Sequence, residues 1–275
     1  MIIERPSDLA SFTTMLLASG RIVFTRDEAA RELGISTGAV LDAAERLQRR
    51  RSLLRLRQGF YVVVPPQYLT WGAPPPAWYI DDLMQREKRP YYVGLLKAAE
   101  LHGASHQAVM DFQVVTDKRL ATLRAGRSRL TFHFRKDMSS IAAGVDSHQT
   151  ETGTMQVSGV ELTALDLLRY PDAVGGIDAI ATVLSDLASK MDYQRLAKLA
   201  RACERTVVQR LGYLVDRLGH RDSTELMQGE LRKSPKALAW IELERNSAAV
   251  KDASPALERN ERWHVIVNRS PEADE

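Results

Sequence analysis

The apolar positions near the N-terminus repeat with helical spacing. Capping residues and glycines divide this part of the chain into three predicted helices, over residues 7–19, 25–33 and 36–49. In the third helix Val40 and Ala44 belong to an inward apolar stripe, and the polar residues between them turn outward. A three-helix core with one polar, outward-facing helix surface is therefore expected.

The spacing changes from helical to alternating after the third helix. Residues 53–57 and 60–64 are rich in β-formers, and Gln58 and Gly59 join them in a tight turn that needs a positive φ. Three helices followed by a hairpin are typical of a winged helix-turn-helix domain. In such a domain the third helix reads DNA and the hairpin is the wing.

Arginines are concentrated between this third helix and the hairpin. From residue 46 to residue 57 the chain carries six arginines and no acid, which favours contact with phosphates and with guanine edges. Solvated arginines near a helix end, or a winged helix used for protein docking, are the alternatives. The predicted DNA-binding residues are Ser36, Thr37, Gly38, Asp42, Arg46, Arg49, Arg50, Arg51, Arg55, Arg57 and Gln58.

Prolines and aromatics interrupt regular structure over residues 66–79. We therefore expect a winged helix-turn-helix domain over residues 1–65, a linker over 66–79 and a larger mixed α/β C-terminal domain over 80–275. The fold class is α+β.

The C-terminal part predicts a small mixed sheet and a helical layer. Helices are expected over residues 80–87, 91–101, 158–168 and, as three stretches, 177–218, with another from Ser234 through Leu243. Strands are expected over residues 112–116, 130–135, 154–157 and 262–268.

Composition narrows the class of protein. The chain has 275 residues, 44% of them hydrophobic and 27% charged, so two folded domains are expected. A net charge of +3 is mild, so local clusters indicate a polyanion partner better than the total does. The single cysteine, Cys203, excludes an internal disulfide. Without a signal-like segment or a long apolar run, we expect a cytoplasmic protein with no membrane contact.

Candidate catalytic residues are few. Glu161 and Asp166 are five positions apart on one predicted helix and do not converge on a metal, so Glu161 is interpreted as a capping residue. His102 and His106 have the spacing of helical metal ligands, but Gly103 ends the helix between them, and bonding of His102 to carbonyls is favoured. We assign no catalytic, metal-binding or cofactor-binding residue and expect no enzyme activity.

A second basic run follows the first predicted strand of the C-terminal part. It contains no acid, and it predicts either a surface for nucleic acid or an acidic partner, or a solvated sheet edge. Its members are Lys118, Arg119, Arg124, Arg127, Arg129, Arg135 and Lys136.

Two segments resemble a known family. Residues 89–103, RPYYVGLLKAAELHG, are similar to a YY-x-x-L-x-x-A-A-x-x-H-G segment of AbiEi-type antitoxins, and residues 157–168, VSGVELTALDLL, resemble their V-S-x-x-E-x-T-x-x-D-L-L segment. The order of winged helix, these two segments and then helices also agrees with that family.

The resemblance implies a two-part function. The N-terminal domain would bind an inverted-repeat operator in double-stranded DNA and repress its own transcription, and the C-terminal domain would counteract a nucleotidyltransferase-like toxin, directly or indirectly, in phage defence. Two rivals remain: a winged-helix regulator whose C-terminal domain senses a ligand, and a nucleic-acid-processing enzyme that depends on Glu161 or Asp166.

Overall fold

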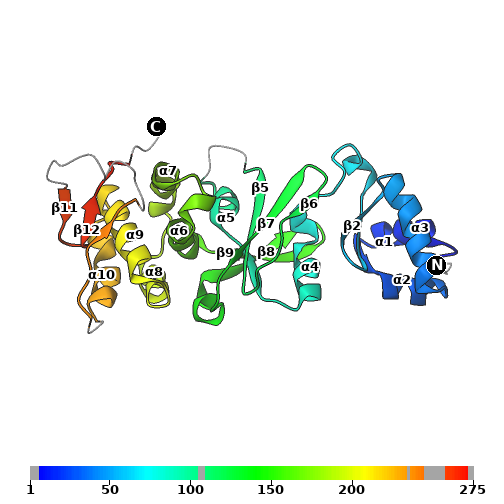
Figure 1. Ribbon diagram of the computed structural model, residues 1–275, viewed down its shortest axis with the longest axis horizontal. Helices are drawn as coiled ribbons and strands as arrows, with labels where there is room; N and C mark the ends of the chain where they lie inside the picture. Colours follow the sequence, from blue (N-terminus) through cyan, green and yellow to red (C-terminus); the bar gives the residue numbers. More distant parts are fainter. Residues whose placement is uncertain (1–5, 105–108, 234–235, 245–257, 272–275) are drawn as a thin grey trace. The chain divides into compact units, whose positions relative to one another are not determined.

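The computed structural model describes residues 6–104, 109–233, 236–244 and 258–271 (Figure 1). Helices and several sheets are mixed along the chain, which confirms the α+β class. By residue contacts the chain forms two compact units that interleave in sequence. The first unit comprises Met1–Tyr92, Met110–Lys136 and Ser147–Gln156, and the second comprises Val93–Val109, Asp137–Asp146 and Val157–Glu275.

The first unit begins with three helices and a three-stranded sheet. The helices are α1 (Leu9–Ala18), α2 (Arg26–Leu33) and α3 (Thr37–Arg49), and the strands are β1 (Val23–Thr25), β2 (Leu53–Arg57) and β3 (Phe60–Val63). The sheet has the order β1-β3-β2, and both of its strand pairs are antiparallel. Gly59, with φ +67°, allows the tight turn between β2 and β3.

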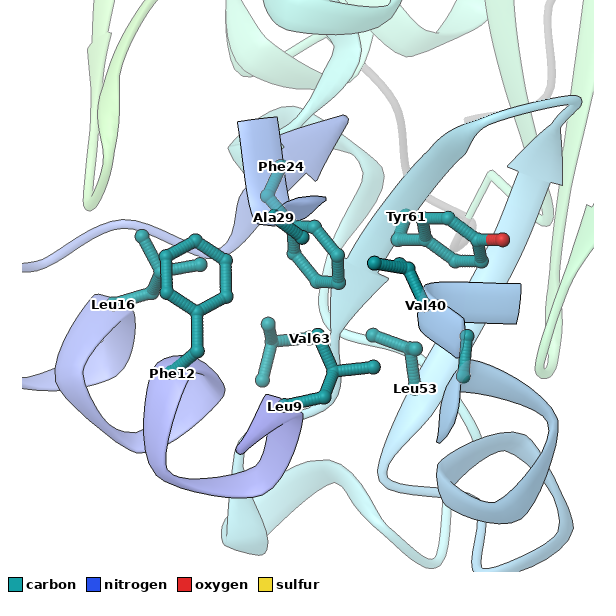
Figure 2. Close-up of a cluster of buried hydrophobic side chains, with 10 residues drawn as sticks. Leu9, Phe12, Leu16, Phe24, Ala29, Val40, Leu53, Tyr61 and Val63 are labelled. Carbon is teal, nitrogen blue, oxygen red and sulfur yellow. The ribbon is translucent and has the colours of Figure 1, made fainter. Parts of the chain in front are cut away.

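The side chains between these helices and the sheet form one apolar core (Figure 2). Phe24 lies at its centre, edge-on to Phe12 at 5.5 Å between ring centroids and stacked on Tyr61 at 5.2 Å. Val40 and Ala44 of α3 are fully buried in this core, as their spacing predicts. Burial of one face of α3 leaves its opposite face to solvent.

Predicted caps set the ends of α2 and α3. Thr25 Oγ1 accepts a hydrogen bond from the Glu28 N–H at 3.1 Å, and Glu28 Oε2 accepts one from the Thr25 N–H at 3.3 Å. Gly34 ends α2 in the left-handed region, with φ +67°. Ser36 then caps α3 by accepting a hydrogen bond from the Ala39 N–H.

Beyond the first sheet the chain makes two 3-10 turns, Pro66–Tyr68 and Pro76–Trp78, and then helix α4 (Ile80–Glu87). A second sheet follows, with the order β6-β7-β5-β4-β9-β8. Its strands are β4 (Tyr91–Val93), β5 (Asp111–Thr116), β6 (Leu123–Ala125), β7 (Ser128–Phe134), β8 (Val145–Thr150) and β9 (Gly153–Ser158). Strand β7 lies parallel to β5 and antiparallel to β6.

The helix expected over residues 91–101 is wrong in its first part. Residues Tyr91–Val93 form β4, where Val93 pairs with Val157 of β9, and only Leu95–Leu101 form helix α5. Local apolar spacing could not reveal this, because the partner that makes Tyr91–Val93 a strand is distant in sequence.

The second unit contains most of the helices. Besides α5 these are α6 (Val160–Arg169), α7 (Ile177–Ala188), α8 (Tyr193–Ala200), α9 (Arg205–Arg217) and α10 (Glu225–Arg232). Residues 161–168 of α6 are all buried, because α6 packs against α5, α7, α8 and α9.

A small sheet, with the order β10-β12-β11, closes the described chain. Its strands are β10 (Ile241–Glu242), β11 (Glu258–Asn260) and β12 (Val265–Val267). The helix expected from Ser234 through Leu243 is therefore wrong where the chain is described, because Ile241 pairs in parallel with Val265. Residues 234 and 235 lie outside the described residues.

Candidate functional site

The outward face of α3 carries the predicted base-contacting residues. Two fully buried residues, Val40 and Ala44, fix the rotation of the helix about its axis. On the other side the structure leaves these residues exposed: Ser36, Thr37, Gly38, Asp42, Arg46 and Arg49. The helix thus presents hydroxyl, carboxylate and guanidinium groups next to a glycine that allows close approach of the backbone.

Arginines continue this charge beyond the end of α3. Arg49 forms an ion pair with Glu45 at 3.5 Å, but both side chains are more than half exposed, so the pair contributes little to stability. Arg50 is the C-terminal cap and is exposed, as is Arg51. Arg51 has φ +59°, a left-handed conformation in which glycine is the usual residue. Four exposed guanidinium groups thus lie along the last turn of α3 and just past it: Arg46, Arg49, Arg50 and Arg51.

The two arginines of β2 differ in their surroundings. Arg55 is exposed. Arg57 is half-buried, and its Nε donates to Glu87 Oε1 of α4 at 3.0 Å. The exposed Gln58 accepts a hydrogen bond through its carbonyl from Arg86 at 2.9 Å, so α4 also holds the hairpin turn. Arg57 is therefore ion-paired and not a free cation. Its sequence neighbours do not reveal this, because its partner Glu87 lies thirty positions further along the chain.

The second basic run does not form one continuous surface. Arg135 is 2% exposed, so it is a buried residue and not a surface cation. Both carboxylate oxygens of Asp111 accept hydrogen bonds from Arg129 at 2.6 Å, and Lys118 lies 3.6 Å from Glu87.

The remaining residues of the run are exposed: Arg119, Arg124, Arg127 and Lys136. Arg119 lies over the ring of Phe134 and Arg127 over the ring of Trp71. The run itself contains no acid, but the fold brings Asp111 and Glu87 to it from outside, where they pair with Arg129 and Lys118.

A polar network joins α5 to the start of α6 in the second unit. His102 caps α5, and its Nε2 lies 2.7 Å from the carbonyl oxygen of Ser158. The Ser158 hydroxyl lies 2.7 Å from the Thr163 hydroxyl, and both side chains are fully buried. Bonding of His102 to a carbonyl is confirmed, whereas His106 lies outside the described residues.

Glu161 connects α6 to α8. It is 3% exposed, and its Oε1 accepts a hydrogen bond from the N–H of Asp192, the N-cap of α8, at 2.8 Å. Its Oε2 lies 3.5 Å from Arg195, which also forms a two-point pair with Asp146. The expectation that Glu161 caps its own helix is wrong: the N-cap of α6 is Gly159, which makes no side-chain cap.

Comparison with known families identifies the part of the chain that contains this network. The family model of the AbiEi antitoxin C-terminal domain matches residues 92–217. This part of the chain is similar to an AbiEi antitoxin domain. The resemblance predicted from the two motif segments is thereby confirmed.

Residues of the two AbiEi motif segments connect the elements of the domain. His102, Ser158 and Thr163 tie α5 to α6, and Glu161 ties α6 to α8. Tyr91, the first tyrosine of the other motif segment, donates its hydroxyl to Asp81 at 2.9 Å, and burial raises its pKa. These motif residues form hydrogen bonds to other residues of the chain, and these bonds hold the elements of the AbiEi domain and the adjoining residues together.

One solved structure extends the comparison over nearly the whole chain. The crystal structure of the RV2827C protein from Mycobacterium tuberculosis superposes with a TM-score of 0.65 at 16% sequence identity, covering 96% of this chain and 94% of that one. At this identity the similarity shows the fold. No curated protein matches the sequence.

The described residues contain no group of three histidine, cysteine, aspartate or glutamate residues placed to hold a metal ion. None of the helices in the described part of the chain has the length and apolar character to cross a membrane.

Proposed function

We propose that this AbiEi-domain protein is a DNA-binding autorepressor and an antitoxin that counteracts a nucleotidyltransferase-like toxin. The observation that carries the DNA-binding half is the exposed polar and cationic face of α3, opposite the buried Val40 and Ala44. The order of α2, the left-handed Gly34, the capped α3 and the β2–β3 hairpin supports a winged helix-turn-helix.

In this proposal α3 enters the major groove. Thr37 and Asp42 lie toward base edges, and Gly38 allows the helix to approach the DNA closely. Arg46, one turn further along the exposed face than Asp42, donates to a guanine edge or a phosphate. Operator half-sites arranged as an inverted repeat would then bind two copies of the chain.

The remaining exposed arginines position the protein on the DNA backbone. Arg49, Arg50 and Arg51 neutralise phosphates beside the groove, and Arg55 reaches the backbone from the hairpin. The pairing of Arg57 with Glu87 gives Arg57 a different role: it holds the wing in position against α4.

The antitoxin half of the proposal is supported by the family match. The AbiEi domain implies a toxin as the partner, and the hydrogen bonds of His102, Ser158 and Thr163 hold α5 and α6 of that domain together. The nucleotidyltransferase-like class of the toxin comes from the family resemblance.

Replacement of Arg46 tests DNA reading. A duplex is first selected from a random library by the wild-type chain. Arg46→Ala should then lose about 1–3 kcal/mol of binding free energy, roughly 5- to 150-fold in Kd, if the residue reads a base. Arg232→Ala, which removes an exposed arginine from α10, is the matched control. Equal Kd values for the Arg46 and Arg232 variants would refute the assignment of α3.

Separation of the two activities tests the antitoxin half. The full chain carrying Arg46→Ala and Arg50→Ala should lose repression of a reporter fused to its own promoter. It should still rescue cells that express the toxin encoded beside it, because both changes lie outside residues 92–217. Failure of the wild-type chain to rescue those cells would contradict the antitoxin assignment.

A further inference from the structure

The hairpin formed by β6 and β7 lies next to the β2–β3 hairpin within the first unit. Cα atoms of β2 and β6 approach within 8 Å of one another. The turn of the β6–β7 hairpin is fixed by its backbone, because the Arg127 N–H donates to the Trp71 carbonyl at 3.1 Å. The position of this hairpin beside β2 is therefore built into the fold.

Two glycines allow the turn of the β6–β7 hairpin to lie close to the backbone around Trp71. Gly126 has φ +57°, and a Cβ added to it would lie 2.1 Å from the carbonyl oxygen of Trp71. A Cβ on Gly72, with φ +78°, would lie 3.2 Å from the Cα of Gly126. Since any side chain at residue 126 would push the two segments apart, the structure requires glycine at the hairpin turn.

Two arginines of the hairpin carry positive charge that no acid among the described residues neutralises. Arg124 and Arg129 face each other across β6 and β7, and Asp111, in register with Arg129 on β5, pairs with Arg129 through both oxygens. Glu87 is likewise shared between Arg57 and Lys118. Within the described part of the chain, neither Arg124 nor Arg127 forms an ion pair, and both are exposed.

The ring of Trp71 holds the Arg127 side chain in place before any ligand binds. Its guanidinium lies 5.6 Å from the ring centroid of Trp71, a residue that is 54% exposed. A guanidinium held over an aromatic face keeps its charge and its outward donors, and it loses less conformational entropy on meeting a phosphate. The exposed Trp71 is thereby explained as the support of a cation.

We infer that Arg124 and Arg127 of the β6–β7 hairpin, together with Arg55 of β2, form a second backbone-contacting ridge that binds phosphates of the duplex flanking the base pairs read by α3. This ridge rests on the proposed DNA-binding function and extends it: the protein holds DNA with the hairpin of a second sheet as well as with α3 and its wing. Because the ridge contacts phosphates only, it adds affinity without adding sequence preference.

Salt titration of a double variant tests the ridge. If each arginine neutralises one phosphate, Arg124→Ala with Arg127→Ala should lower the slope of log K against log salt by about 1.8. Between 50 and 200 mM salt, this difference makes the wild-type affinity fall roughly 12-fold more than that of the variant. The matched control is Arg232→Ala with Lys236→Ala, which removes the same charge from two exposed positions elsewhere and should keep the wild-type slope.

Two further measurements make the result specific. Arg124→Lys with Arg127→Lys should restore most of the slope, because a lysine can still neutralise a phosphate. Trimming the duplex to the selected core should lower the wild-type slope by all three ridge contacts, and it should lower the slope of the alanine double variant only by the contact of Arg55, about 0.9. A wild-type slope in the alanine double variant, with DNA still bound, would overturn the ridge alone. Absence of duplex binding by the wild-type chain would overturn both the ridge and the proposed function.

Discussion

Substitution of Gly126 by alanine probes the contact that positions the β6–β7 hairpin. The added Cβ meets two penalties: a left-handed backbone at φ +57° and an overlap at 2.1 Å with the Trp71 carbonyl oxygen. The backbone term for a non-glycine residue is about 1 kcal/mol. Relief of the overlap needs a shift of about 1 Å, which breaks the hydrogen bond from Arg127 to Trp71 and costs about 1 kcal/mol more, with lost packing in addition. We expect Gly126→Ala to lower the free energy of unfolding by about 3 kcal/mol.

Gly20→Ala is the matched control for the backbone term. Gly20 has φ +75°, and an added Cβ would have no atom within 4 Å. This substitution should therefore cost only about 1 kcal/mol. The free energies of both variants are measured by urea denaturation, followed by the fluorescence of the four tryptophans in the chain. Equal losses for the two variants would show that the overlap at residue 126 is relieved without cost, and the argument for a fixed hairpin would then fail.

Three other predictions follow from the described contacts. Arg51→Gly should raise the free energy of unfolding by about 1 kcal/mol, because it relieves the left-handed backbone at φ +59°, and it should weaken all duplexes alike; thermal melts and gel shifts check the two effects. His133→Phe should flatten the loss of stability between pH 7 and pH 5. Burial lowers the pKa of His133 in the folded chain below the ordinary value of 6.5, against an opposing effect of Asp111. The unfolded chain therefore binds more protons as the pH falls through 6.5, which destabilises the folded wild type. Urea titrations at both pH values would show whether the wild type loses more stability than the variant. Glu161→Ala should cost about 1–3 kcal/mol, because the N–H of Asp192 at the start of α8 loses its buried acceptor; an unchanged melting temperature would contradict a structural role for this carboxylate.

Local patterns predicted the elements whose stability is local. The Thr25–Glu28 capping box and the Ser36 cap start two of the predicted helices, and helix α4 forms over Ile80–Glu87 as expected. These features depend on residues three or four positions apart, which the sequence places together in any helical conformation. The stripe of Val40 and Ala44 likewise predicted which face of α3 is buried, because helical periodicity alone sets that face.

Strands with distant partners were harder to predict. Tyr91–Val93 have the apolar spacing of a helix, yet β4 forms because β9 supplies the pairing partner. The polar strand β8 and the short strand β6 give little local signal, since many of their side chains are exposed. The strand β10 replaces a predicted helix for the same reason, since its hydrogen-bonding partner is β12.

The candidate DNA surface shows the same division. The sequence alone determined which arginines are available on α3, because charge and helical period are local properties. Only the tertiary structure decided which of the other cations are free. Glu87 neutralises Arg57, Asp111 neutralises Arg129, and Arg135 is buried, whereas Arg124 and Arg127 remain exposed on the β6–β7 hairpin. The physical reason is that ion pairing and burial depend on distance in space, and the acids that neutralise these arginines lie many residues away along the chain.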